Sequence, residues 1–216
     1  MTPIKLYTMA TPNGQKVSIA LEEFGIPYEA TTINILKGDQ FSDFYVGLNP
    51  NSKIPAIIDP DGPGGKEIKM MESGAILMYL ADKVGQGIPQ DSYKRNECIQ
   101  WLFFQMASVG PMFGQFGHFY RYTDQCDHPY PTERYKKETQ RLLGVLEKRL
   151  SQGKFIMGDQ FTIADIAIFP WVKCLDHFYK AREFLGMDDF KATMGWLDAC
   201  WDRPATAKGS VVGTID

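Results

Sequence analysis

The sequence predicts an α/β domain at the N-terminus and an all-helical domain after it. Two observations lead to this fold class. Short apolar runs alternate with helical patterns from residue 3 to about 84, and beyond residue 90 the strand signals give way to long helical patterns. The chain has 216 residues, enough for two small domains that each bury a core. We therefore expect one domain at residues 1–86 and a helical domain at residues 91–216.

The first domain is expected to open with a strand, a helix and a second strand. Residues 4–8 form an apolar run of strand length, and residues 13–24 carry apolar side chains at helical spacing until Gly25 ends the helix. Residues 28–35 predict the second strand. The order of these elements is β-α-β.

A hairpin and a helix are expected to complete the first domain. Residues 55–59 and 68–71 read as strands, and the proline- and glycine-rich segment 60–65 between them predicts a turn. Helical spacing resumes at residues 73–84, where one face is apolar. The order of these elements is β-β-α.

The helical domain is expected to contain two well-marked helices. Residues 132–150 place apolar side chains on one stripe and basic side chains elsewhere, which predicts one buried and one solvated face. A further helix is expected to begin at Thr162, because Asp165 completes a capping box three residues later. The aromatic-rich stretch 101–122 is expected to supply mostly core or dimer packing, with a kink or helix end at Gly110-Pro111 and a few apolar side chains near it that are suited to the wall of a ligand pocket.

Composition and charge exclude several classes of protein. A net charge of −3 and a pI near 5.7 give no reason to expect nucleic acid as a partner. The sequence contains no apolar run long enough to span a bilayer, so we expect no membrane partner. The first residues lead directly into a strand and lack the pattern of a secretory signal, which predicts a cytoplasmic location.

The cysteines and histidines predict neither disulfides nor a metal site. The four cysteines form no C-x-x-C pair and have no metal-like spacing to the three histidines: Cys98, Cys126, Cys174 and Cys200. We expect reduced thiols, most of them buried, with Cys126 in a loop-like stretch as the exception to consider. No histidine receives a catalytic role.

The order of domains and four sequence segments resemble a known superfamily. The segments are Thr11-Pro12-Asn13-Gly14-Gln15-Lys16, Asn51-Ser52-Lys53-Ile54-Pro55-Ala56-Ile57, Met71-Glu72-Ser73-Gly74-Ala75-Ile76 and Gly110-Pro111-Met112-Phe113-Gly114-Gln115. Together they resemble the cytosolic glutathione transferases, and more narrowly the bacterial nu class that is related to the yeast nitrogen-regulator prion protein. This resemblance implies an α/β thioredoxin-like N-terminal domain that binds glutathione, an all-α C-terminal domain, and a homodimer.

Catalysis by bound glutathione requires a site that favours its thiolate. A thiol with a pKa near 8.5 is only about 3% ionised at pH 7, and the thiolate is the nucleophile. A helix N-terminus with hydroxyl and amide donors can stabilise this anion, and the resemblance assigns Thr11 and Asn13 to the sulfur. Thr11 followed by Pro12 is also an ordinary helix start, so a purely structural role for Thr11 stays open. Tyr7 is an alternative activating residue, although a half-buried strand tyrosine needs no such role.

The resemblance also implies the other glutathione contacts. A cis peptide bond between Ile54 and Pro55 would turn the edge of the third strand toward the tripeptide backbone. Glu72 is expected to meet the γ-glutamyl ammonium and Ser73 the α-carboxylate, although Glu-Ser is also a reasonable helix start. The glycyl end or a second glutathione is assigned to Gln40 and Lys53. Arg134 is expected to reach a ligand carboxylate, or else to form a surface ion pair.

These features predict a glutathione-dependent thiol-disulfide oxidoreductase with weak transferase or peroxidase activity. No cysteine precedes Cys98, so in this interpretation glutathione itself is the nucleophile, and reduced or oxidised glutathione is the cosubstrate. Two alternatives stay open: a transferase that conjugates a small electrophile, and a non-catalytic glutathione carrier or regulator. The small-molecule second substrate is not identified by the sequence.

Overall fold

The structure is a computed structural model that describes residues 2–121, 123–125 and 128–215. These residues form two compact units, one of residues 2–88 with 202–215 and one of residues 89–201. The expected fold class is confirmed, with a mixed α/β unit and a helical unit. The units differ from the expected domain boundaries at one point, because the last described residues belong to the first unit.

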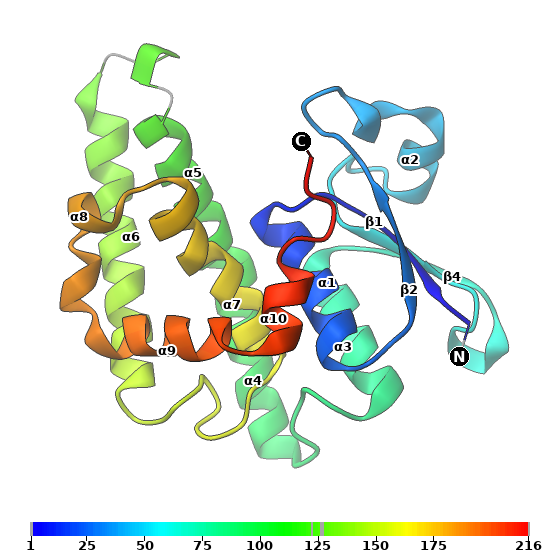
Figure 1. Ribbon diagram of the computed structural model, residues 1–216. Helices are drawn as coiled ribbons and strands as arrows, with labels where there is room; N and C mark the ends of the chain where they lie inside the picture. Colours follow the sequence, from blue (N-terminus) through cyan, green and yellow to red (C-terminus); the bar gives the residue numbers. More distant parts are fainter. Residues whose placement is uncertain (1, 122, 126–127, 216) are drawn as a thin grey trace. The chain divides into compact units, whose positions relative to one another are not determined.

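The first unit is built around a four-stranded mixed sheet in the order β2-β1-β3-β4 (Figure 1). β1 pairs parallel to β2 and antiparallel to β3, and β3 pairs antiparallel to β4. The helix α2 was not expected from the sequence. The elements are β1 (Ile4–Thr8), α1 (Pro12–Glu23), β2 (Tyr28–Thr32), a 3-10 turn (Asp39–Phe41), α2 (Asp43–Leu48), β3 (Ala56–Asp59), a second 3-10 turn (Pro63–Gly65), β4 (Ile68–Met71), α3 (Ser73–Val84) and α10 (Pro204–Gly209).

Alternation along β1 and β3 divides the core of this unit between the two faces of the sheet. Tyr7 packs against a cluster that includes Tyr45 and Leu48 of α2 together with Ala56 and Ile58 of β3. The neighbouring positions of β1 point to the opposite face, where they are fully buried and where α1 and α3 pack on each other (Figure 1). The sheet is therefore covered on both faces.

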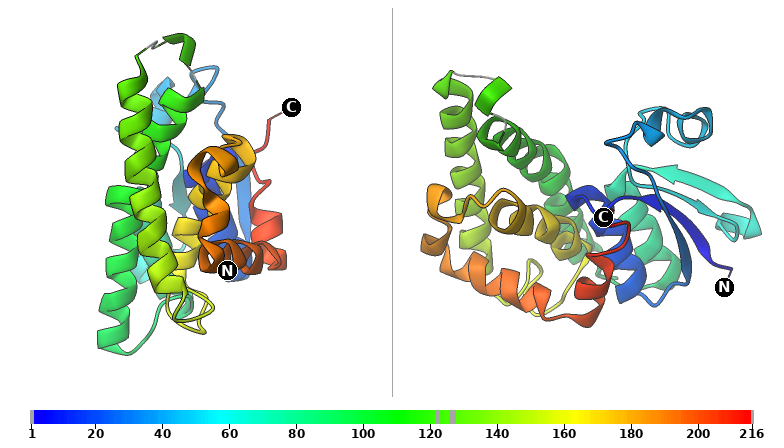
Figure 2. Two further views of the ribbon diagram at one scale, coloured as in Figure 1. Left: turned by 90° about the vertical axis from the view of Figure 1, so that its left-hand side faces the viewer. Right: turned by 45° about the horizontal axis from the view of Figure 1, so that its top comes forward.

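The C-terminal segment packs along α1, as the right-hand view in Figure 2 shows. Ser18 Oγ donates a hydrogen bond to the Gly209 carbonyl at 2.7 Å, and Gln15 Nε2 donates one to the Ser210 carbonyl at 2.8 Å. These bonds explain why two polar side chains of α1 are buried. A Cβ on Gly209 would lie 2.5 Å from Ile19 Cα, so the close approach of the two helices requires glycine there.

The second unit is helical. Its elements are α4 (Ser92–Phe104), a π-helical turn (Gln105–Val109), α5 (Gly110–Arg121), a 3-10 turn (Thr123–Gln125), α6 (Pro129–Leu150), α7 (Ile163–Lys173), a second π-helical turn (Cys174–Phe178), α8 (Arg182–Leu185), a 3-10 turn (Met187–Asp189) and α9 (Lys191–Trp201). The expected irregularity at Gly110-Pro111 takes the form of the first π-helical turn, since proline removes one helical hydrogen bond.

The predicted capping box at Thr162 is confirmed. The Asp165 carboxylate is fully buried and accepts hydrogen bonds from the backbone N–H groups of Ile156 and Thr162, from the Thr162 hydroxyl and from Trp196 Nε1, all between 2.8 and 3.0 Å. Asp165 thus ties the start of α7 to the preceding loop and to α9. The structural role expected for it is confirmed.

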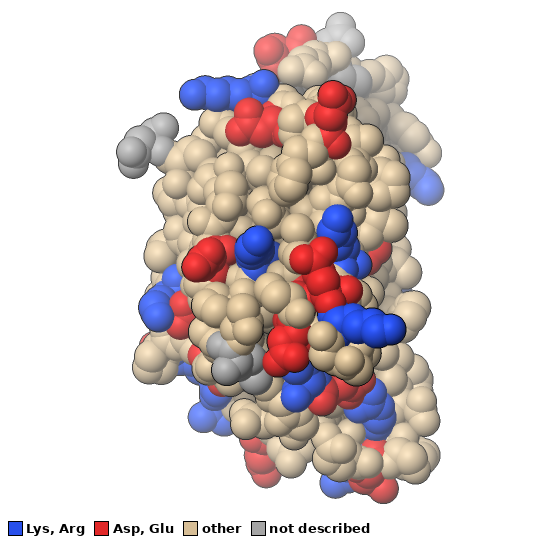
Figure 3. Space-filling view, turned by 90° about the vertical axis from the view of Figure 1, so that its right-hand side faces the viewer, with Lys and Arg blue, Asp and Glu red and all other residues tan. Residues whose placement is uncertain are grey.

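One face of the molecule shows no dominant patch of one charge (Figure 3). On the face seen in Figure 3, Lys and Arg side chains are interspersed with Asp and Glu side chains. None of the helices in the described ranges combines the length and apolar composition needed to cross a bilayer. Of the cysteines in the described part of the chain, Cys98, Cys174 and Cys200 are buried and form no disulfide, and Cys126 lies outside the described residues.

Candidate functional site

The candidate site lies at one edge of the sheet in the first unit. Tyr7 of β1 pairs with Ala56 of β3, which in turn pairs with Met71 of β4, so these three residues form one row across the sheet. β1 ends one residue beyond this row, whereas β4 ends and β3 begins within it. The turn after β1, the peptide before β3 and the start of α3 after β4 therefore share one edge.

The turn after β1 places Thr11 and Asn13 at the N-terminus of α1. Thr11 is the N-cap, and its Oγ1 accepts a hydrogen bond from the Gly14 N–H at 3.4 Å. Pro12 occupies the first helical position, and Asn13 follows in the first turn, half-buried. Thr11 therefore caps the helix, which is the structural role that the sequence left open, and its capping hydrogen bond is rather long.

The C-terminal segment fixes the backbone of this turn. The Ala10 N–H donates to the Gly213 carbonyl at 3.1 Å, and Gln15 Nε2 lies 3.4 Å from the Ala10 carbonyl while it also bonds Ser210. Gly14 packs so closely that a Cβ there would lie 2.0 Å from the Met9 carbonyl oxygen. The turn that carries Thr11 and Asn13 is thus held from two sides.

The peptide bond between Ile54 and Pro55 is cis, as the sequence predicts. The loop before it is fixed because the Lys53 carbonyl accepts hydrogen bonds from the Tyr45 hydroxyl at 2.9 Å and from Asn49 Nδ2 at 2.6 Å. The Lys53 side chain is exposed and Ile54 is half-buried. This arrangement leaves the lysine side chain at the surface beside the start of β3.

Glu72 has an unusual backbone conformation at the start of α3. Its φ is 68° and its ψ is 109°, and its side chain is exposed while making no capping hydrogen bond. A positive φ is uncommon for a residue with a Cβ and is often found at functional sites. Ser73 follows as the first residue of α3 and is buried. The strained residue therefore presents a carboxylate to solvent next to a helix N-terminus.

A buried lysine lies beneath this helix start. Lys16 of α1 is completely buried, and its Nζ donates to Ser73 Oγ at 3.2 Å. Burial lowers the pKa of Lys16 to about 7, with the negative charge of Glu72 acting in the opposite direction. The sequence analysis assigned no role to Lys16. The only sign in the sequence is that Lys16 stands beside the apolar stripe of its helix. The structure shows that this helix is buried over much of its surface.

Gln40 lies in the 3-10 turn between β2 and α2. Its Nε2 is 3.3 Å from the Ile35 carbonyl, and its Oε1 is buried without a hydrogen-bond partner among the described residues. A buried amide oxygen without a partner is costly, so it is suited to accept a hydrogen bond from a ligand. Gln40 follows β2, which ends at the same edge of the sheet as β1.

Tyr7 lies on the face of the sheet that α2 covers. Its ring is half-buried and packs at 5.3 Å from the ring of Phe44. The opposite face carries α1. This packing accounts for Tyr7 without a catalytic role.

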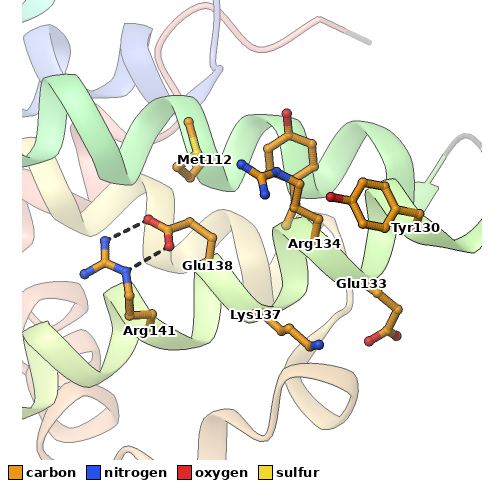
Figure 4. A pocket seen from close by; sticks show the side chains of 8 residues that line it. Met112, Tyr130, Glu133, Arg134, Lys137, Glu138 and Arg141 are labelled. Atoms are coloured by element: carbon orange, nitrogen blue, oxygen red, sulfur yellow. Dashed lines mark hydrogen bonds and ion pairs between the residues drawn. The ribbon is translucent and has the colours of Figure 1, made fainter.

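Arg134 lies in the second unit, where it lines a cavity of about 650 Å³ along α6 (Figure 4). Met112 of α5 contributes to the same cavity, and Glu138 is held by Arg141 through two hydrogen bonds of 2.7 and 2.8 Å. Hydrogen bonding to Arg141 lowers the pKa of Glu138, and Arg134 adds to this effect. The structure thus places Arg134 in a polar cavity of its own unit.

Comparisons with known proteins agree with this architecture. Residues 2–82 match the family "Glutathione S-transferase, N-terminal domain", and residues 118–204 match "Glutathione S-transferase, C-terminal domain". The disulfide-bond oxidoreductase YghU of Escherichia coli K12 is 44% identical over 218 residues, which cover 97% of this chain and 75% of that protein. The chain therefore belongs to the glutathione S-transferase family.

Two solved structures are similar over almost the whole chain. A glutathione transferase family member from Pseudomonas fluorescens Pf-5, with two glutathione bound, has a TM-score of 0.95 and 49% identity, covering 97% of this chain and 92% of that one. A glutathione transferase from Pseudomonas putida, with one glutathione disulfide bound per subunit, has a TM-score of 0.94 and 46% identity, covering 96% and 90%.

Proposed function

We propose that the protein is a glutathione-dependent disulfide-bond reductase in which the thiolate of bound glutathione is the nucleophile. One observation carries this proposal. The edge of the sheet presents a helix N-terminus with Thr11 and Asn13, but the first cysteine of the chain is Cys98. The first unit therefore offers groups that stabilise a thiolate and no thiol of its own, so the reacting sulfur has to come from a ligand.

In this proposal Thr11 and Asn13 lower the pKa of the glutathione thiol. The Thr11 hydroxyl and the Asn13 amide donate hydrogen bonds to the sulfur, and the N-terminus of the 12-residue α1 adds a favourable dipole. Lowering a thiol pKa by about two units makes most of the sulfur anionic at pH 7 and requires roughly 2.7 kcal/mol. Two charge-assisted hydrogen bonds are sufficient to supply this amount.

The reaction consumes two glutathione molecules for each disulfide. The first thiolate attacks one sulfur of the substrate disulfide, forms a mixed disulfide and expels a substrate thiolate that takes up a proton. The second thiolate attacks the glutathione sulfur of the mixed disulfide and expels the other substrate thiolate. The products are two substrate thiols and one glutathione disulfide, so the site has to accept two tripeptides.

The other residues at the sheet edge are proposed to bind the tripeptide. The main chain of Ile54 at the cis Pro55 pairs with its extended backbone, and Glu72 and Ser73 bind the γ-glutamyl ammonium and carboxylate. Gln40 is proposed to bind the glycyl end through its buried oxygen.

Two basic residues are proposed to bind ligand carboxylates. Lys53, exposed beside the start of β3, is assigned to the glycyl end or to a second glutathione. Arg134 is assigned to a ligand carboxylate from within the cavity along α6.

The comparisons support reduction over conjugation as the main activity. One similar protein is named a disulfide-bond oxidoreductase, and similar structures hold two glutathione molecules or one glutathione disulfide. We expect conjugation of electrophiles and reduction of peroxides to be weaker activities of the same thiolate. A non-catalytic carrier would have no use for thiolate-stabilising groups at the sheet edge.

Turnover of hydroxyethyl disulfide with glutathione tests the proposal. We expect steady oxidation of glutathione that depends on both substrates and is faster than turnover of a model aryl halide or a peroxide. If the folded protein binds glutathione but turns over none of the three substrates, the enzyme proposal is wrong. Faster turnover of the aryl halide would instead identify a conjugating transferase.

We also propose that the protein is a cytoplasmic homodimer. Its described cysteines form no disulfide, which suits a reducing compartment. In the dimer, the first unit of one subunit is expected to meet the helical unit of its partner. Sedimentation at micromolar concentration checks this assembly, and a monomer would contradict it.

A further inference from the structure

We propose that Lys16 is a positioning residue for the γ-glutamyl end of glutathione, because its ammonium group holds Ser73 Oγ so that the serine hydroxyl donates to the ligand's α-carboxylate. The inference rests on the proposed function, since it assumes that glutathione binds at the start of α3. It adds to the site a residue that does not touch the ligand and acts through Ser73.

The geometry around Ser73 sets the direction of its hydroxyl. Lys16 Nζ lies 3.2 Å from Ser73 Oγ, and both side chains are buried. Once a ligand carboxylate has brought Lys16 into its protonated form, the ammonium group can only donate hydrogen bonds, so the serine oxygen is then the acceptor. A hydroxyl oxygen that accepts from a lysine can donate its proton at the same time, and a ligand carboxylate, with its full negative charge, is a strong acceptor for that proton.

Three positive features thereby converge at the start of α3. The helix is 12 residues long, and its first N–H groups and dipole favour an anion. The Ser73 hydroxyl supplies a hydrogen-bond donor, and the positive charge of Lys16 lies at hydrogen-bond distance from the serine oxygen. Glu72 supplies an exposed carboxylate for the ammonium group on the same ligand carbon. Together these groups match the zwitterion of a γ-glutamyl residue.

Burial of Lys16 makes this arrangement sensitive to the ligand. Its pKa is lowered to about 7 by burial, and Glu72 raises it in part. At the far end of α1, Lys208 pairs with Glu22 and Arg203 pairs with Glu23. A ligand carboxylate on Ser73 adds a negative charge close to Lys16, so binding is expected to raise the lysine pKa and take up a proton above pH 7.

S-methylglutathione is the probe for binding, because it keeps the γ-glutamyl group and has no ionisable thiol. We expect Lys16→Met to weaken its binding roughly tenfold, the loss typical of one charge-assisted hydrogen bond. Calorimetry at pH 8 in buffers of different ionisation enthalpy should show that the wild type takes up more protons on binding than Lys16→Met does. Lys83→Met is the matched control, since Lys83 is a lysine of the same unit paired with the buried Asp59 at 2.8 Å.

Kinetics provide a second, independent measurement. In hydroxyethyl disulfide reduction, Lys16→Met should raise KM for glutathione roughly tenfold and leave kcat within about twofold, because the γ-glutamyl end is remote from the sulfur. With cysteinylglycine, which lacks the γ-glutamyl group, the variant and the wild type should have the same kcat/KM. A general loss of structure would affect both thiols alike.

The outcomes separate this inference from the proposed function. If Lys16→Met binds S-methylglutathione within twofold of the wild-type affinity and takes up as many protons, the proposed role of Lys16 is wrong. This holds even if the protein reduces the disulfide. Lys16-dependent binding without any turnover would support the inference and overturn the proposed reductase. If Lys16→Met does not fold, absence of proton uptake by the wild type at pH 8 is itself sufficient to reject the inference.

Discussion

Thr11 combines two roles that substitutions can separate. Its oxygen accepts the Gly14 N–H at the start of α1, and its hydroxyl proton is proposed to bond the glutathione sulfur. A hydroxyl can accept from the helix and donate to a ligand at the same time. Capping of α1 and binding of the glutathione sulfur are therefore compatible roles for Thr11.

We expect Thr11→Asp to keep the helix cap and lose catalysis. Aspartate is as good an N-cap as threonine, but it cannot donate to the thiolate and places a negative charge beside it. The melting temperature should stay close to that of the wild type, while kcat/KM for glutathione falls at least roughly tenfold. Thr11→Ser is the control and should retain both properties. Unchanged turnover in Thr11→Asp would leave Thr11 as a helix cap alone.

The sequence predicted the segments that meet at the candidate site better than the residues that support them. Thr11, Pro55 and Glu72 stand in recognisable segments, and the structure brings the segments to one edge of the sheet. Lys16 lies in one of the same segments but was not predicted, because its importance depends on which residue of α3 it meets. Helical periodicity reports which face of a helix is buried and says nothing about such a pairing.

At the scale of elements, the strands and the longest helices followed from local patterns. β1, β4 and α3 have the bounds that the sequence predicts. The helix α2 was missed because six residues, one of them Gly47, are too few for a periodic signal. The C-terminal helix α10 packs in the first unit, which the sequence did not indicate, since its contacts with Gln15 and Ser18 lie some 190 residues away in the sequence.

The packing of α10 on α1 predicts that one methyl group added at Gly209 strongly lowers the stability of the protein. A Cβ on Gly209 would approach the backbone of Ile19 to 2.5 Å, and backbone atoms cannot move aside as the end of a side chain can. We expect Gly209→Ala to destabilise the protein by roughly 2 kcal/mol, as overpacking in a close-packed core does. Chemical denaturation followed by circular dichroism measures this effect.

Gly47→Ala is the matched control for Gly209→Ala. Gly47 also lies in a helix of the first unit, but a Cβ there would meet nothing within 4 Å. Because alanine is the better helix former, this substitution should stabilise the protein by up to about 1 kcal/mol. Equal effects of the two substitutions would mean that α10 does not pack on α1 in solution as described.

The capping box at Thr162 predicts a comparable loss of stability when Asp165 in the second unit is replaced. Asp165→Asn replaces one carboxylate oxygen by an NH2 group, which then faces donors from Thr162 or from Ile156 and Trp196. A buried clash of donors costs roughly 2 to 3 kcal/mol. Asp198→Asn, on the exposed side of α9, should change the urea midpoint little. A midpoint for Asp165→Asn equal to that of the control would argue against the structural role.

At the scale of the whole molecule, the unit that carries the candidate site is discontinuous in sequence. The C-terminal segment returns to α1, and the Gly213 carbonyl accepts a hydrogen bond from Ala10 one residue before Thr11. The C-terminal segment thus helps to hold the turn that carries Thr11 and Asn13. A pattern read along the chain separates two domains by their periodicity, but it cannot show that the end of the chain belongs to the first of them.

The buried lysine gives the whole protein a measurable dependence of stability on pH. Burial lowers the pKa of Lys16 in the folded state to about 7, whereas an unfolded lysine titrates near about 10.4. Between these values the unfolded chain binds more protons than the folded one, so the free energy of unfolding rises with pH. From pH 7 to pH 9 this single group is expected to contribute about 2 kcal/mol.

Comparison with Lys16→Met isolates this contribution from the other titrating groups. Lys173 also has a pKa lowered by burial, to about 8, and Cys174 has one raised by burial to about 11, but both are present in wild type and variant. Urea midpoints at pH 7 and pH 9, measured without glutathione, should rise more in the wild type than in Lys16→Met. If the two proteins respond to pH in parallel, Lys16 does not change its charge on folding and its ammonium is as well solvated as in the unfolded chain.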